Sequence, residues 1–195
     1  MSESIKAIGG INENSLNEYE KFIRTFIPEN LTQEQLPTFL SEKRSELRVK
    51  YGMPDRQPVL DGKETLEEYH EKLLLLAGEK EIGVVSDFEK YTQKHHLPEG
   101  ANACFGDDTD YKIHVKKDFN PNDVPNVKSL EHELVHALQY KNEPGMPIEQ
   151  KEFEAYLVAD GLDDIFKNPN LRDIFFSLII SSVDGYKKSA ISKEK

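Results

Sequence analysis

Polar and hydrophobic positions follow a helical plan through the first half of the chain. Four short signals mark helix starts, each a Ser or Thr followed three residues later by Glu or Gln. In this arrangement the two side chains satisfy free backbone N–H groups of the first turn. The four pairs are Ser15 with Glu18, Thr32 with Gln35, Thr65 with Glu68, and Ser86 with Glu89. We therefore expect helices near residues 16–27, 33–50, 65–78 and 87–96.

The pattern changes after residue 98, where two short apolar runs flank the turn-like segment 106–110. Residues 101–105 and 111–115 predict two strands that form a short hairpin or a small antiparallel sheet. In the second run, hydrophobic residues alternate with Lys112, His114 and Lys116, as expected for a strand with one buried face. His114 is therefore expected to face solvent or a neighbour on its strand.

Three further helices are expected near residues 127–140, 147–166 and 171–183. The first of them has a hydrophobic stripe that should face the core, made of Leu130, Leu134, Val135 and Leu138. The order of the elements predicts an α+β fold. Residues 1–97 would form a helical region, and residues 98–195 a hairpin followed by helices.

Composition narrows the classes of function. The 195-residue chain has a net charge of -11, which disfavours binding to nucleic-acid phosphates and to anionic membranes. Its single cysteine, Cys104, excludes an internal disulfide and fits a reducing compartment. The chain shows no secretory signal, and its longest apolar run is about half the roughly 20 residues needed to cross a bilayer. We expect a cytoplasmic protein without a nucleic-acid or membrane partner.

The strongest chemical signal is the segment His132-Glu133-Leu134-Val135-His136. Residues four apart share one face of a helix, so both imidazoles can reach a single ion. Glu133 lies beside them and can accept a proton from a water that the ion activates. Zinc suits two imidazoles plus a carboxylate and leaves a fourth position open. The alternative is an amphipathic helix that carries surface His and Glu residues by chance.

A third ligand would come from the following helix, which offers Glu149, Glu152 and Glu154. Each residue of a helix turns by about 100°, so Glu152 and Glu154 cannot both face the ion. The small Ala155 shares the face of Glu152 and would let this helix approach closely. Glu154 is expected to pair with Lys151 in water.

Three segments, taken in order, resemble a known family. The segment 132–136 is preceded by Asn-Ala-Cys-Phe at 102–105 and followed by Glu-Phe-Glu-Ala at 152–155. This set is similar to the edge-strand, H-E-x-x-H and E-x-x-A motifs of the gluzincin metallopeptidases. The resemblance covers roughly residues 100–160 and implies a zincin-like metallopeptidase core within residues 98–195.

The resemblance also implies roles for individual residues. The Zn²⁺ ligands would be His132, His136 and Glu152, and the general base would be Glu133. An extended substrate strand would be held by Asn102 and Ala103. Many gluzincins have an Asp four residues after the zinc-binding Glu, where this chain has Tyr156. The partner that orients the imidazoles is therefore open. Cys104 is either a small buried thiol or a thiolate that blocks zinc in a latent form.

These features predict a zinc-dependent endopeptidase that acts on a polypeptide substrate with Glu133 as general base. The alternative is a regulatory or partner-binding protein on the same fold, which cleaves one dedicated partner or none. Residues 1–97 could serve as a propeptide, as a specificity lobe or as support for the fold. The sequence does not choose among these three, nor does it indicate an oligomeric state.

Overall fold

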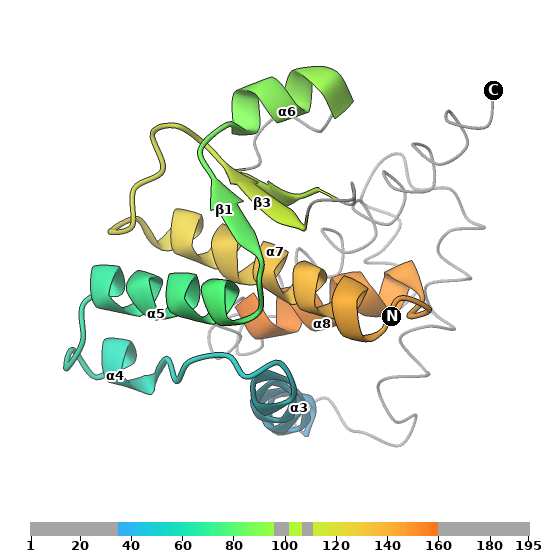
Figure 1. The fold of residues 1–195 in the computed structure, drawn as a ribbon. Helices are drawn as coiled ribbons and strands as arrows, with labels where there is room; N and C mark the ends of the chain where they lie inside the picture. The colour runs from blue at the N-terminus through green and yellow to red at the C-terminus, as the bar shows by residue number, and fades with distance from the viewer. Residues whose placement is uncertain (1–34, 96–101, 107–110, 160–195) are drawn as a thin grey trace, which may run out of the picture. The chain divides into compact units, whose positions relative to one another are not determined.

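In a computed structural model of the protein, residues 35–95, 102–106 and 111–159 are described. These residues form an α+β structure of six helices and a three-stranded sheet (Figure 1). The helices expected at 16–27 and 171–183 lie outside the described residues, as do the helix starts at Ser15 and Thr32. The elements are α3 (Leu36–Lys50), α4 (Gln57–Leu60), α5 (Leu66–Glu79), β1 (Gly83–Val85), α6 (Phe88–His95), β2 (Ala103–Phe105), β3 (Lys112–Val115), α7 (Val124–Asn142) and α8 (Ile148–Ala159).

Five of these helices coincide with expected ones, and α5 shows the reason in its first turn. The Thr65 hydroxyl accepts the backbone N–H of Glu68 at 3.1 Å, and the Glu68 carboxylate accepts the N–H of Thr65 at 2.7 Å. The expected reciprocal cap is therefore present there. Helix α7 begins three residues earlier than expected because Pro125 occupies its first turn, where the missing N–H costs no hydrogen bond.

The sheet has the strand order β1-β3-β2. Strands β2 and β3 are antiparallel, with Cys104 opposite His114, so the expected hairpin pairing is confirmed. The expectation of a purely antiparallel sheet is wrong, because β1 joins β3 in parallel. A strand of three residues has too little alternation to be recognised locally, and its partner lies almost 30 residues further along the chain. The sheet thus combines a strand from residues 1–97 with two from residues 98–195.

Strand β3 is buried on both faces rather than on one. Ile113 and Val115 are buried, and so is His114, which the alternating pattern placed on the polar face, toward solvent or a neighbour on its strand. Helix α6 accounts for the difference: the His114 ring stacks on Tyr91 with a centroid distance of 3.8 Å, and its Nδ1 lies 2.6 Å from the Asp87 carboxylate. The strand is therefore covered by α6 on one side.

Helix α7 is the central element of the described structure. It lies against β2 and β3 of the sheet and also against α5 (Figure 1). Its expected stripe of Leu130, Leu134, Val135 and Leu138 is fully buried. Because α7 is covered along most of its length, the polar side chains within it must find partners inside the protein.

The chain divides into two compact units. One comprises residues 1–43, 147–153 and 161–195, and the other residues 44–146 and 154–160. The described part of the first unit consists of the opening segments of α3 and α8, and each of these helices continues unbroken into the second unit. The second unit contains α4 to α7 and the whole sheet. Within the described part of the chain, every helix is too short or too polar to cross a bilayer.

Candidate metal centre

Helix α7 brings His132 and His136 together on one face, as their spacing predicts. Their Nε2 atoms lie 2.9 Å apart, and the two rings meet edge to face with centroids separated by 4.5 Å. His136 is buried and His132 half-buried. Two nitrogen atoms this close must share a proton or a cation, because two lone pairs facing each other repel.

Helix α8 adds Glu152 to this pair. One ligand atom from each of His132, His136 and Glu152 lies within 4.8 Å of the others, and the Glu152 side chain is buried. Among the described residues, no other group of three His, Cys or acidic side chains lies close enough together to hold an ion. Glu149 and Glu154, the other acids considered on this helix, are not part of it.

The three donors fit a transition metal. Two imidazoles and a carboxylate are typical zinc ligands, and imidazole also suits copper, iron and nickel. Bonds of about 2.0–2.1 Å in tetrahedral geometry separate the ligand atoms by about 3.4 Å. The two Nε2 atoms, 2.9 Å apart, would therefore need to separate by about half an ångström. Small rotations about the side-chain χ angles of the two histidines would provide this separation without a rearrangement of the helix.

Glu154 has a different role from the expected one. It is buried, and its carboxylate accepts hydrogen bonds from the Tyr51 hydroxyl and from Lys50 Nζ, the latter at 3.1 Å. The expectation that it pairs with Lys151 in water is wrong, because the residues that end α3 cover this side of α8. Helix α8 is thus buried on two faces, with Glu152 on one and Glu154 on the other.

Glu133, the expected general base, lies on α7 next to the histidines and is half-buried. Its Oε2 accepts the backbone N–H of Phe105, in β2, at 2.7 Å. This bond links α7, which carries the candidate histidine ligands, to the strand expected to hold a substrate. Sequence reasoning did not single out Phe105 itself.

Strand β2 stands at one edge of the described sheet. The Asn102 carbonyl accepts the N–H of Lys116, and its side-chain oxygen accepts Lys116 Nζ at 2.9 Å, so Asn102 is committed to β3. Backbone groups alternate in direction along a strand, so those of Ala103 and Phe105 point away from β3. Of the two residues expected to bind substrate, Ala103 turns its backbone groups away from β3 and Asn102 does not, but Ala103 itself is buried.

Each imidazole has a neighbour that orients it. His136 Nδ1 lies 3.0 Å from Oε1 of the fully buried Gln139. The His132 ring packs against the Tyr156 ring at a centroid distance of 4.4 Å, so Tyr156 supports this histidine by packing. Gln139 was missed in the sequence, although its spacing of three residues from His136 on a helix is a usable signal.

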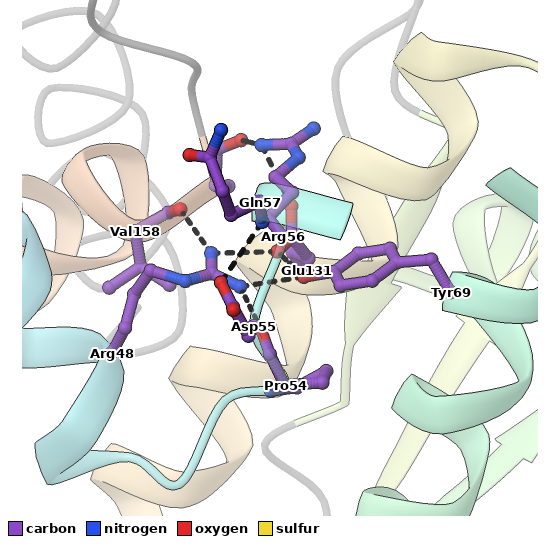
Figure 2. A network of polar contacts seen from close by, with 9 residues as sticks. Arg48, Pro54, Asp55, Arg56, Gln57, Tyr69, Glu131 and Val158 are labelled. Atoms are coloured by element: carbon purple, nitrogen blue, oxygen red, sulfur yellow. Dashed lines mark hydrogen bonds and ion pairs between the residues drawn. The ribbon is translucent and has the colours of Figure 1, made fainter. Parts of the chain in front are cut away.

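Figure 2 shows a second polar cluster, which is centred on Glu131 of α7. The Glu131 carboxylate is completely buried and pairs with Arg48 at 2.9 Å and with Arg56 at 3.3 Å. Tyr69 donates its hydroxyl proton to the same carboxylate. The two arginines also bind the last carbonyls of α8: Arg48 donates to Val158 at 3.1 Å and Arg56 to Ala159 at 2.9 Å. This cluster therefore holds the end of α8 against α7.

The electrostatics of the cluster favour the charged form of Arg48. Burial by itself would lower the pKa of Arg48, but Glu131 and Tyr69 outweigh it and raise that pKa. Burial, and then the Glu131 charge, raises the pKa of Tyr69, so its hydroxyl stays protonated and able to donate. No pattern in the sequence predicted this cluster, because an isolated arginine on a helix normally reads as a solvated residue.

Cys104 belongs to neither cluster. Burial raises the pKa of its thiol, and the charges of Glu133 and Asp87 raise it further. The thiol is therefore protonated at neutral pH and is not among the residues grouped with the histidines. These facts favour an ordinary thiol, here half-buried, over the latent thiolate ligand.

Comparisons with known proteins add no relative. No protein-family model, no curated protein and no solved structure matches the chain. The resemblance to gluzincins therefore rests on the three short motifs alone, and the candidate site rests on its own geometry.

Proposed function

We propose that this protein is a zinc-dependent endopeptidase with a zincin-like core. His132, His136 and Glu152 would hold the ion, and Glu133 would act as the general base. The observation that carries the proposal is the approach of three ligand atoms, from two helices, to within 4.8 Å of one another. Three acids were available on α8, and the one with the E-x-x-A spacing is the one that meets the histidines.

A zinc ion in this site would supply a Lewis acid with an open coordination position. Glu133 follows His132 in the chain and would take a proton from the attacking water, then pass it to the leaving amine. Its carboxylate already lies at the sheet edge, 2.7 Å from the Phe105 nitrogen. A peptide lying along that edge would bring its carbonyl close to Glu133.

The edge position of β2 in the described sheet supports a polypeptide as the substrate. The backbone groups of Ala103 and the carbonyl of Phe105 point away from β3 and could pair with an extended chain as an added strand, whereas the Phe105 N–H already donates to Glu133. The single cysteine supports a reducing compartment such as the cytoplasm. The acidic net charge supports the absence of a nucleic-acid or membrane partner.

The test combines metal analysis with peptide cleavage. Freshly purified wild type should contain one zinc per chain, and His136→Ala should contain none. Glu133→Gln keeps an oxygen for the Phe105 N–H but removes the base, so cleavage of a mixed peptide library should fall by roughly 100- to 10,000-fold with zinc retained. Equal zinc content in wild type and His136→Ala would remove the site, and equal cleavage by Glu133→Gln would remove the mechanism.

The bond between Glu133 and Phe105 favours a second candidate, in which Glu133 is a structural clasp and the protein acts by binding a partner. In that case zinc-loaded wild type would cleave no peptide in the library. Glu133→Ala would then lower stability more than Glu133→Gln, because only the glutamine keeps an acceptor for the Phe105 N–H. Peptide cleavage by zinc-loaded wild type therefore separates the two candidates, whereas the loss of stability in Glu133→Ala is expected under both.

A further inference from the structure

His136 stands at one end of a buried chain of hydrogen bonds that leads away from the candidate metal centre. Its Nδ1 lies 3.0 Å from Gln139 Oε1. The Gln139 side chain hydrogen-bonds the Tyr51 hydroxyl, and that hydroxyl donates to the Glu154 carboxylate. Lys50 Nζ lies 3.1 Å from the same carboxylate and 2.8 Å from the Glu143 carboxylate. Four of the residues, namely Tyr51, His136, Gln139 and Glu154, are buried.

The direction of each hydrogen bond in this chain follows from the one before it. An ionised carboxylate only accepts, so the Tyr51 hydroxyl must donate its proton to Glu154. The hydroxyl oxygen is then left to accept, and the group of Gln139 that can donate to it is the amide NH₂. The Gln139 amide oxygen must therefore face His136, where it can only accept.

The last step concerns the imidazole. An amide oxygen beside Nδ1 requires the proton on Nδ1, which leaves the lone pair of a neutral His136 on Nε2. Nε2 is the atom that faces His132 at 2.9 Å. In this arrangement the Glu154 carboxylate is linked, through the two neutral side chains of Tyr51 and Gln139, to the position of the proton on His136.

We infer that Tyr51, Gln139 and Glu154 are positioning residues that hold His136 in its Nδ1–H tautomer and present Nε2 to the metal. The part of this inference that concerns metal affinity rests on the proposed function, whereas the tautomer belongs to the zinc-free protein as well. In the sequence, Glu154 was an alternative to Glu152 as the third ligand. In this arrangement it acts instead on His136, through Tyr51 and Gln139.

The surroundings of Tyr51 keep the chain in one state. Burial raises the pKa of the Tyr51 hydroxyl, and its bond to Glu154 raises it further, while the bond from Gln139 acts in the opposite direction. The hydroxyl therefore remains a donor throughout the neutral pH range. No proton has to move within the chain for it to orient His136.

The decisive comparison uses two tyrosines in the same kind of setting. Tyr51 and Tyr69 are both buried, and each donates its hydroxyl proton to a buried glutamate. Tyr51 is connected to Gln139, whereas Tyr69 belongs to the Glu131 cluster. Tyr51→Phe and Tyr69→Phe therefore remove the same group, and only the first should affect His136.

Two measurements on the full-length chain separate the outcomes. In zinc-free protein, ¹⁵N NMR of the histidine rings should show His136 as Nδ1–H in wild type and Tyr69→Phe, and as a mixture of tautomers in Tyr51→Phe. In competition with a chelator, Gln139→Leu should weaken zinc binding by about 10- to 100-fold and Tyr51→Phe by up to about tenfold, with Tyr69→Phe near wild type.

The results distinguish this inference from the proposed function. Identical His136 ring signals in wild type, Tyr51→Phe and Gln139→Leu would overturn the positioning chain, whatever the zinc affinity. Wild type that binds no zinc would overturn the proposed function, while the tautomer measurement would still decide the inference. A mixed tautomer in Tyr51→Phe together with weaker zinc binding would support both.

Discussion

Two buried glutamates flank the candidate ligands and are neutralised in different ways. Glu131 directly precedes His132 and pairs with the two arginines Arg48 and Arg56. Glu154 follows Glu152 by two residues and is bound by a tyrosine hydroxyl and by Lys50. Lys50 is more than one-third exposed, whereas Arg48 and Arg56 are nearly buried.

The difference separates a residue that holds the fold from one that orients the site. Removal of one partner from a group of buried charges leaves the others without compensation, and that cost falls on the stability of the whole unit. Glu154 has a water-accessible cation, and its other contact leads through neutral groups to His136. Its loss should therefore affect the orientation of the imidazole more than folding.

Both glutamates take their partners from residues 48–69, within the region that the sequence left without a role. Arg48 and Arg56 also bind the final carbonyls of α8. A protease that removed these residues would leave Glu131 buried without a counter-charge. These contacts favour a supporting role for residues 48–69 over that of a removable propeptide.

The largest effect should come from the Glu131 cluster. Arg48→Met should lower the free energy of unfolding by about 3–5 kcal/mol, because it leaves a buried carboxylate short of a partner. Lys50→Met is the matched change at Glu154 and should cost at most about 1 kcal/mol, as for exposed pairs. Urea titration measures both. Similar losses in the two variants would show that the glutamates do not differ as described.

The second effect concerns zinc and compares the two acids of α8. Glu152→Gln should weaken zinc binding by at least about 100-fold, since it removes a charged ligand, and Glu154→Gln by up to about tenfold, since it acts through His136. Chelator competition gives both values. If Glu154→Gln lost zinc while Glu152→Gln retained it, the assignment of the two faces of α8 would be reversed.

The dependence of stability on alkaline pH tests whether the Tyr51 and Tyr69 hydroxyls stay protonated in the folded state. Burial, followed by the neighbouring carboxylates, raises the pKa of Tyr69 and of Tyr51. The unfolded chain releases these protons near pH 10 while the folded chain keeps them. The free energy of unfolding should therefore fall as pH rises above about 10, by up to about 1.4 kcal/mol per pH unit for each tyrosine. The double variant Tyr51→Phe/Tyr69→Phe should show a flatter decline, and an unchanged slope would contradict the prediction.

The smallest expected effect is a loss of stability near the Glu131 cluster that leaves zinc affinity unchanged. Thr65→Ala removes the reciprocal cap of α5, the helix that carries Tyr69, and should cost about 1 kcal/mol in the free energy of unfolding. Thr65→Ser keeps the hydroxyl and should stay close to wild type. Zinc affinity should be unchanged in both. A loss of zinc affinity in Thr65→Ala would mean that the Glu131 side also orients the ligands.

The sequence by itself determined the features that depend on neighbouring residues. The cap at Thr65, the buried stripe of α7 and the pairing of β2 with β3 follow from local spacing and are confirmed. The meeting of His132 with His136 also agrees with helical geometry, because a turn of about 100° per residue sets which side chains share a face. The same rule separates Glu152 from Glu154 on α8, whereas the approach of Glu152 to the histidines depends on how two helices pack.

Only the tertiary structure decided where the polar side chains of those helices find their partners. Glu154 meets Tyr51 across a sequence separation of 103 residues, and Glu131 meets Arg48 across 83. No local pattern reports contacts of this length, so Glu154 was expected in water and Glu131 was not noticed. Strand β1 and the burial of His114 were missed for the same reason, since each depends on an element that packs from elsewhere in the chain. Spacing along a helix sets the direction of a side chain, but what lies in that direction depends on how distant segments pack.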